Sequence, residues 1–147
     1  MSAIRRADAS WSGDLATGTG VVSASTSYEF TDLPVTWAAR TESSDGKTSP
    51  EELLAAAHAS CFAMALSGAL GRAGAPPQKL SVTAEVTFDK LEVGWRVISS
   101  AITVRGVAAG ISEADFKAAA EATRDGCPIS QALKGNVALS VDATLEG

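Results

Sequence analysis

The stretch SPEELLAAAHASCFAMALSGALGR, residues 49–72, decides the fold predicted for this chain. Ser49 is a suitable N-cap, Pro50 suits the first helical position, and Glu52 completes a capping box with Ser49. Gly71 and Gly74 favour an end to the helix there, and Pro76 and Pro77 forbid its continuation. The pattern predicts one helix that begins at Pro50 and ends near Arg72.

Apolar side chains occupy nearly every face of this predicted helix. One stripe at helical spacing holds Leu53, Ala57, Cys61 and Met64. Further faces hold Leu54, Phe62, Leu66 and Leu70. A helix that is apolar all round is buried, either in a large core or against a second subunit. The polar residues His58, Ser60 and Ser67 interrupt it, so we interpret it as a core helix and not as a membrane span.

Length and charge restrict the class of protein. The 147 residues suit a single domain, residues 1–147, and 46% of them are hydrophobic, as in a soluble globular protein. The net charge of −5 argues against non-specific binding to nucleic acid or to anionic membranes, because both need a basic surface. We expect neither partner.

The N-terminus and the cysteine count point to a compartment. Arg5 and Arg6 are not followed by an apolar run, so the N-terminus does not resemble a secretory signal. We therefore expect a cytoplasmic protein. In the reducing cytoplasm, Cys61 and Cys127 are more readily explained as reactive or buried thiols than as a structural disulfide.

The order of the predicted elements indicates an α+β fold. Strands are expected at residues 7–11, 21–24, 33–37, 80–88, 95–106 and 137–145. Helices are expected at residues 50–72, 113–124 and 128–134. Pro34 favours an edge position for its strand, and a slip in the alternation of 95–106 suggests a β-bulge. Strands and helices that segregate in this way are typical of α+β proteins.

Cys61 is a thiol that its own helix cannot activate. It lies about 18 Å along the axis from the helix start, whereas the helix dipole acts mainly within the first turn. On an apolar face its pKa should be raised and the thiol inert. A buried cysteine that serves as a small hydrophobic residue therefore remains an open interpretation.

Cys127 occupies a different local environment. It directly precedes Pro128 at the expected start of a short helix, where free backbone N–H groups can stabilise a thiolate. Local physics alone would make it the more reactive thiol of the two. The alternative is an N-cap residue without any chemistry.

His58 is three residues before Cys61 and shares a helix face with it. It could act as a base toward the thiol. It could instead join Cys61 and Cys127 as a metal ligand, or simply form packing and hydrogen-bonding contacts. The sequence leaves these three roles open.

Arg40 and Glu51 flank the polar loop before the long helix. An arginine can lower the pKa of a nearby thiol, and its planar guanidinium is held best by a carboxylate. Glu51 lies in the first helical turn, where the dipole favours an anion. The alternative for both residues is a solvated surface charge.

Two motifs resemble those of a known family. Residues 49–67 (SPEELLAAAHASCFAMALS) resemble the central helix of the OsmC/Ohr family of peroxide reductases, and residues 125–134 (DGCPISQALK) resemble its second cysteine motif. The segment from Trp11 to Gly20 also fits, with similar spacing throughout the chain. His58 and the CPISQ sequence look more like the osmotically inducible (OsmC) branch than the organic hydroperoxide resistance (Ohr) branch.

The resemblance implies an intertwined homodimer, in which a long central helix from each subunit is wrapped by antiparallel sheets. It also implies residue roles at two interfacial active sites. Cys61 would be the peroxidatic cysteine and Cys127 the resolving one, with Arg40 activating the Cys61 thiolate and Glu51 orienting Arg40. The alternative arginines are Arg5, Arg6 and Arg72.

The implied activity is the thiol-dependent reduction of organic hydroperoxides, with hydrogen peroxide as a further candidate substrate. Cys61 would form a sulfenic acid and then a disulfide with Cys127. A dithiol, which the resemblance suggests to be a lipoyl-protein, would reduce that disulfide without a metal, haem or flavin. The rival interpretations are a non-enzymatic binding protein of the same fold and a metal-binding protein that uses His58, Cys61 and Cys127.

Overall fold

The computed structural model describes all residues from Met1 to Gly147, and they form two compact units. The first unit comprises Met1–Leu53 and the second Leu54–Gly147. The first unit contains three strands and a short helix joined by loops, and the second contains a sheet with helices. The α+β class is confirmed, whereas the single domain stays a prediction.

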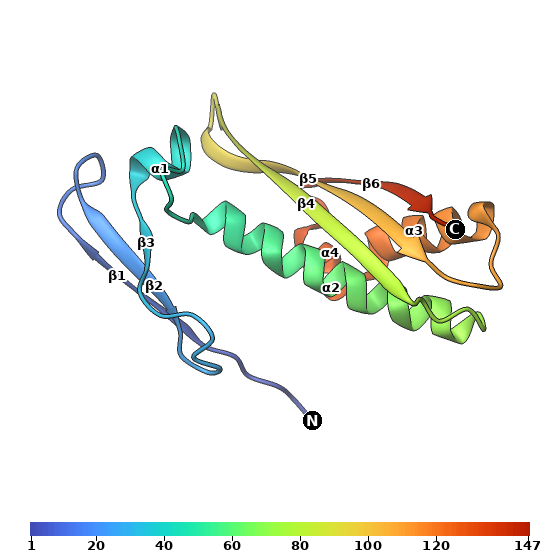
Figure 1. Ribbon diagram of the computed structural model, residues 1–147. Helices are drawn as coiled ribbons and strands as arrows, with labels where there is room; N and C mark the ends of the chain where they lie inside the picture. The colour runs from blue at the N-terminus through green and yellow to red at the C-terminus, as the bar shows by residue number, and fades with distance from the viewer. The chain divides into compact units, whose positions relative to one another are not determined.

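A small antiparallel sheet forms the first unit (Figure 1). Its strands are β1 (Ala7–Ser12), β2 (Thr19–Ala24) and β3 (Leu33–Val35), in the order β1-β2-β3. Pro34 therefore lies on an edge strand, as expected, where its missing N–H costs no ladder hydrogen bond. Gly20 pairs with Trp11, and a Cβ at Gly20 would approach the indole ring to 2.6 Å, so only glycine fits there.

This first sheet has almost no buried core. Every residue of β1 is exposed, and β2 buries only Gly20. An isolated small sheet needs a covered apolar face for stability. The uncovered strand β1 is therefore a surface on which another layer could pack.

A short helix, α1 (Trp37–Thr41), follows β3 and differs from the prediction, which continued the strand to Trp37. Thr36 has an extended backbone, and its Oγ1 accepts a hydrogen bond from Ala39 N at 3.1 Å. This N-cap starts a helix where the β-rich composition suggested a strand. As a result, Arg40 lies on a helical turn and not in a loop.

The long helix α2 (Pro50–Arg72) has the bounds that the sequence predicted. Ser49 Oγ accepts a hydrogen bond from Glu52 N at 3.1 Å, which confirms the N-cap. The reciprocal half of the capping box differs from the prediction, because the Glu52 carboxylate accepts a hydrogen bond from the hydroxyl of Thr48 at 2.7 Å. One half of the capping box is thus replaced by a contact with the preceding loop.

The helix α2 buries one narrow stripe of side chains. The fully buried residues of its second-unit part are His58, Phe62, Leu66 and Leu70, at a spacing of four. Met64 is 71% exposed, and Cys61 is only half-buried. The helix is long and apolar enough to cross a membrane, but the core helices of soluble proteins can be equally long and apolar. The apolar side chains on its other faces are half-buried or exposed.

The second sheet combines strands β4 (Lys79–Leu91), β5 (Gly94–Val107) and β6 (Ala138–Leu145), in that order. The β4–β5 hairpin is antiparallel, whereas β6 runs parallel to β5, so antiparallel sheets describe this unit only in part. A parallel pair needs a long crossover, which α3 (Glu113–Gly126) and α4 (Pro128–Leu133) provide. A register shift opposite Thr87 and Phe88 confirms the expected bulge in the β5 segment.

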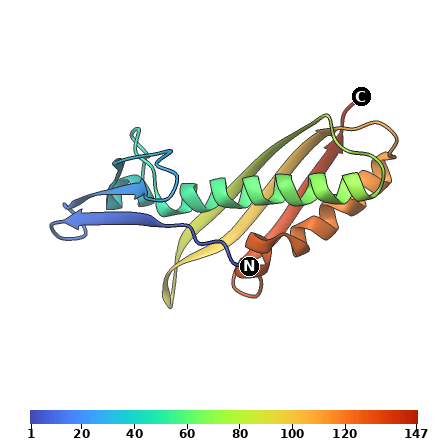
Figure 2. The ribbon, with the colours of Figure 1, turned by 90° about the horizontal axis from the view of Figure 1, so that it is seen from below.

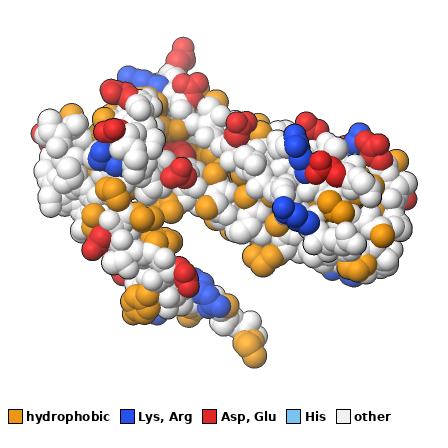
Figure 3. Space-filling model, in the orientation of Figure 1, with side chains coloured by type: hydrophobic (Ala, Val, Ile, Leu, Met, Phe, Trp, Pro, Cys, Tyr) orange, Lys and Arg blue, Asp and Glu red, His pale blue; other side chains and the backbone are white.

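The core of the second unit lies between one face of this sheet and the helices that pack on it (Figure 2). It contains Phe62, Leu66, Leu70, Ile102, Val104, Phe116, Ala120, Cys127 and Ala143. The strict alternation of exposed and half-buried residues along β4 shows that the opposite face of the sheet is open. On the surface in Figure 3, hydrophobic side chains emerge in several patches between charges of both signs.

Candidate active site

Both cysteines are free thiols and both belong to the second unit. Cys61 lies midway along α2, and Cys127 links α3 to α4. The backbone N–H of Cys127 donates to Thr123 O at 3.0 Å, and Ser130 N donates to the Cys127 sulfur at 3.4 Å. Cys127 is thus the N-cap of α4, as the sequence indicated, and it is buried.

The surroundings of Cys61 oppose its ionisation. Burial raises the pKa of the Cys61 thiol, and the neighbouring Cys127 thiol raises it further. The N–H of Ile129, which hydrogen-bonds the Cys61 sulfur, acts in the opposite direction. The interaction between the thiols joins two residues that are 66 positions apart in sequence. Activation of Cys61 needs a positive charge that these neighbours do not supply.

An open apolar groove of about 600 Å³ exposes the Cys61 thiol. Met64 and Ala65 of α2 line one side, and Pro128 and Ile129 of α4 line the other. Small neighbours on α2 leave room above the sulfur. The groove therefore suits an apolar molecule that carries one reactive polar end.

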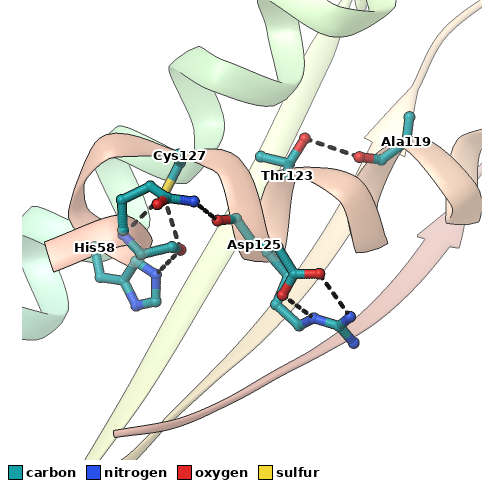
Figure 4. Close-up of polar contacts among 8 residues, drawn as sticks. His58, Ala119, Thr123, Asp125 and Cys127 are labelled. Carbon is teal, nitrogen blue, oxygen red and sulfur yellow. Dashed lines mark hydrogen bonds and ion pairs between the residues drawn. The ribbon is translucent and has the colours of Figure 1, made fainter. Parts of the chain in front are cut away.

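His58 is fully buried and connects two serines, and Figure 4 shows its contact on the side of Cys127. Its Nδ1 is 2.6 Å from Ser100 Oγ on β5, and its Nε2 is 2.8 Å from Ser130 Oγ on α4. The Ser130 hydroxyl is also 3.0 Å from the Cys127 sulfur. Burial lowers the pKa of the imidazole below its ordinary value, so His58 is neutral at pH 7.

This arrangement argues against His58 as a metal ligand, which was one of the roles that the sequence left open. Both ring nitrogens are occupied by serine hydroxyls, which leaves no nitrogen for a metal. The structure gathers no three His, Cys, Asp or Glu side chains in a geometry that could hold a metal ion. Among the roles open to His58, hydrogen bonding is the one that the structure shows.

Arg40 and Glu51 form an ion pair within the first unit. Arg40 Nε donates to the two carboxylate oxygens at 2.9 and 3.1 Å, and Nη2 lies 2.7 Å from Oε1. The guanidinium also lies over the ring of Trp37, 5.8 Å from its centroid. Glu51 is buried while Arg40 is one-third exposed, so the carboxylate fixes a guanidinium that remains accessible.

A second pocket, of about 300 Å³, adjoins this arginine in the same unit. Its lining is mainly apolar and includes Trp11, Leu15, Val35 and Trp37. An arginine beside an apolar pocket combines a donor for an anionic or polar group with space for a hydrocarbon.

The structure thus brings the predicted site residues together in two pairs, Cys61 with Cys127 and Arg40 with Glu51. Two residues of the site were not singled out from the sequence, Ser100 and Ser130. The sequence could have indicated Ser130, because it stands three residues after the helix-capping Cys127, where a side chain can reach the cap. No sequence pattern indicates Ser100, since only the packing of α2 on β5 places it beside His58.

Comparisons with known proteins agree with these motifs. The family model described as OsmC-like protein matches residues 43–142. The chain is 37% identical over 139 residues to peroxiredoxin OsmC of Escherichia coli strain K12, covering 95% of this chain and 96% of that protein. It is 32% identical over 101 residues to the organic hydroperoxide resistance protein OhrA of Bacillus subtilis strain 168, covering 67% and 66%.

Solved structures share the fold at lower identity. An OsmC-like protein from Mycoplasma pneumoniae has a TM-score of 0.70 at 15% identity, with all of both chains covered. OhrB of Bacillus subtilis has a TM-score of 0.68 at 22% identity, with 96% of this chain and 98% of that one covered. The matched family model and the relative that aligns along nearly the whole chain show that this protein is a member of the OsmC family.

Proposed function

We propose that this protein is a cysteine-based peroxidase that reduces organic hydroperoxides. The observation that carries the proposal is the pair of free thiols, Cys61 and Cys127, one at an apolar groove and the other buried behind it. The similar proteins named peroxiredoxin and organic hydroperoxide resistance protein support this activity. Hydrogen peroxide, which cannot use the groove's apolar surface, is the weaker substrate.

The first step takes place at Cys61. Its thiolate attacks the terminal oxygen of the hydroperoxide, the O–O bond breaks, and the alkoxide leaves as an alcohol after taking up a proton. The Cys61 sulfur is oxidised to a sulfenic acid. The Cys127 thiol then displaces water and forms the Cys61–Cys127 disulfide, which a dithiol reduces by exchange. A lipoyl-protein is the dithiol that we propose.

Arg40 provides the charge that the cysteine pair lacks. The Cys61 thiol has a raised pKa in its own unit, so the thiolate needs a cation. Arg40 is accessible, and Glu51 holds its guanidinium through three contacts. We propose that Arg40 stabilises the thiolate and Glu51 orients Arg40. No metal, haem or flavin takes part in this scheme.

The active protein is proposed to be an intertwined homodimer in the cytoplasm. The exposed strand β1 and the uncovered apolar residues of α2, such as Met64, are surfaces that a second copy would cover. Burial of these surfaces would supply the hydrophobic stabilisation that the small first sheet lacks.

Substitution of each cysteine tests the function. Cys61→Ser should abolish peroxide consumption, because a serine hydroxyl cannot replace the thiolate. Cys127→Ser should still consume about one peroxide per protein and then stop as a sulfenic acid. Consumption of tert-butyl hydroperoxide and mass spectrometry of the quenched protein measure both. Full turnover in Cys61→Ser would overturn the proposal in favour of a binding protein whose cysteines are unreactive.

A further inference from the structure

A buried chain of hydrogen bonds leads from the resolving cysteine to the only histidine of the protein. It runs from Cys127 through Ser130 and His58 to Ser100, with consecutive distances of 3.0, 2.8 and 2.6 Å. All four side chains are at most 1% exposed. Three different elements, α2, β5 and α4, contribute its imidazole and hydroxyls.

The hydrogen-bonding capacities of these groups favour one direction along the chain. The Ser130 oxygen has one proton and lies between the imidazole nitrogen and the sulfur of Cys127. A ring nitrogen is a strong acceptor and a sulfur a weak one, so the Ser130 proton is used best on His58 Nε2. His58 Nδ1–H then donates to the Ser100 hydroxyl, and the Cys127 S–H donates to the Ser130 oxygen.

We propose that Ser130 and His58 form a proton relay that deprotonates Cys127 when it attacks the Cys61 sulfenic acid. This inference rests on the proposed peroxidase function and adds two positioning residues to it. A serine in direct contact with the sulfur makes proton removal possible without water in a buried site. The Ser130 N–H, 3.4 Å from the same sulfur, stabilises the thiolate as it forms.

The reaction of Cys127 with the Cys61 sulfenic acid conserves atoms and electrons. The Cys127 proton passes to Ser130 Oγ while the Ser130 proton passes to His58 Nε2. The Cys127 sulfur attacks the Cys61 sulfur, an S–S bond forms, and the S–O bond breaks with its electron pair on oxygen. The departing hydroxide takes a proton from solvent, and His58 later returns its proton to solvent, so one water is released. Cys127 is oxidised, and Cys61 is reduced from sulfenic acid to disulfide.

The surroundings of His58 set the pH range of the relay. The imidazole is in contact with the neutral hydroxyls of Ser100 on β5 and Ser130 on α4. Of the two thiols, Cys127 bonds to Ser130, and Cys61 lies three residues further along α2. Burial alone lowers its pKa from the ordinary value of 6.5. His58 therefore stays neutral, and able to accept a proton, at every pH above 6.5.

The test separates the two chemical steps by rapid mixing of reduced protein with tert-butyl hydroperoxide. Formation of the sulfenic acid depends on peroxide concentration, whereas disulfide formation does not. Samples quenched with a sulfenic-acid trap and a thiol-blocking reagent give both rates by mass spectrometry. We expect Ser130→Ala to slow disulfide formation about 100-fold at pH 7 while the peroxide step is unchanged.

The pH profile distinguishes a relay from a merely structural role. Disulfide formation in the natural protein should be nearly independent of pH between about 6.5 and 8.5, because the proton acceptor is internal. In Ser130→Ala and in His58→Asn the proton must leave to solvent, so the rate should rise about tenfold per pH unit. Ser130→Thr, which keeps the hydroxyl, should restore the flat profile.

Thr123→Val is the matched control, because it also removes a buried hydroxyl, one that is bonded to Ala119 O at 2.8 Å and not to a thiol (Figure 4). It should leave both the rate and the pH profile unchanged. Flat profiles in both Ser130→Ala and His58→Asn would overturn the relay, whatever their absolute rates. Absence of any sulfenic acid in Cys127→Ser would instead overturn the peroxidase function, so the two failures are distinguishable.

Discussion

The Arg40–Glu51 pair and the His58–Ser130–Cys127 network both hold a polar group in place, but by different physics. The pair is ionic, and the guanidinium is one-third exposed. The network is uncharged and fully buried. A charge near water can stabilise a thiolate at moderate desolvation cost, whereas a buried group moves a proton best when it is neutral at rest. In the proposed mechanism the ion pair therefore serves the Cys61 thiolate, and the neutral network serves the deprotonation of Cys127.

The units that contain these regions also differ in packing. The second unit has a continuous core from Phe62 to Ala143, while the first has an exposed β1 and hardly any buried side chain. A unit with its own core can keep a neutral network dry. The first unit would complete its packing only with a further layer, which is the proposed role of a second subunit.

The largest expected effect concerns this difference in packing. Phe62→Ala removes a fully buried ring from the core of the second unit and should lower the free energy of unfolding by about 3–5 kcal/mol. Val93→Ala is the control, because Val93 is 73% exposed at the tip of the β4–β5 hairpin. Urea unfolding followed by circular dichroism measures both. A Phe62→Ala protein as stable as Val93→Ala would show that the second unit does not depend on this core.

The next effect tests the ionic region. Arg40→Ala should reduce the rate of the peroxide step about 100-fold, because it removes a preorganised charge from the proposed thiolate. The pKa of the Cys61 thiol, followed by its absorbance at 240 nm or by alkylation rate against pH, should rise at the same time. Glu51→Gln keeps Arg40 but loosens it, so its effect should be smaller.

An unchanged Cys61 pKa in Arg40→Ala would remove Arg40 from the mechanism. Arg5→Ala, Arg6→Ala and Arg72→Ala test the alternative arginines, none of which is paired with Glu51. Disulfide formation after oxidation should be unaffected in Arg40→Ala, because the neutral network serves that step. A loss of rate confined to the peroxide step would therefore show that the ion pair and the neutral network serve different steps.

The smallest expected effect is the pH dependence of the protein's stability that arises from the buried, neutral His58. The pKa of His58 is lower in the folded protein than its ordinary value of 6.5, so the unfolded chain binds the proton more readily. The resulting stabilisation is fully present above pH 6.5 and is lost as the pH falls through the folded pKa. The slope cannot exceed about 1.4 kcal/mol per pH unit for one proton.

Unfolding midpoints between pH 7.5 and pH 5 measure this contribution. His58→Asn should be less stable at neutral pH, but its stability should decline less steeply on acidification than that of the natural protein. Parallel declines in the two proteins would contradict a buried neutral imidazole.

Much of the fold follows from local patterns. The bounds of α2 follow from Ser49, Pro50 and the glycines near Arg72, and the bulge in β5 follows from the slip in alternation. The helix α1 was missed because a single capping threonine, Thr36, outweighed a β-rich composition. The parallel pairing of β6 was also missed, because strand direction depends on how the α3–α4 crossover packs.

The sequence by itself determined the two cysteine motifs, the caps and the apolar character of α2, since all depend on residues within a few positions of one another. It also showed that Cys61 lies too far along its helix for the dipole to activate it. Only the tertiary structure decided which face of α2 is buried, which thiols meet, and that His58 bonds to Ser100 and Ser130. These contacts join residues 42 and 72 positions apart, and no local preference specifies such a pairing.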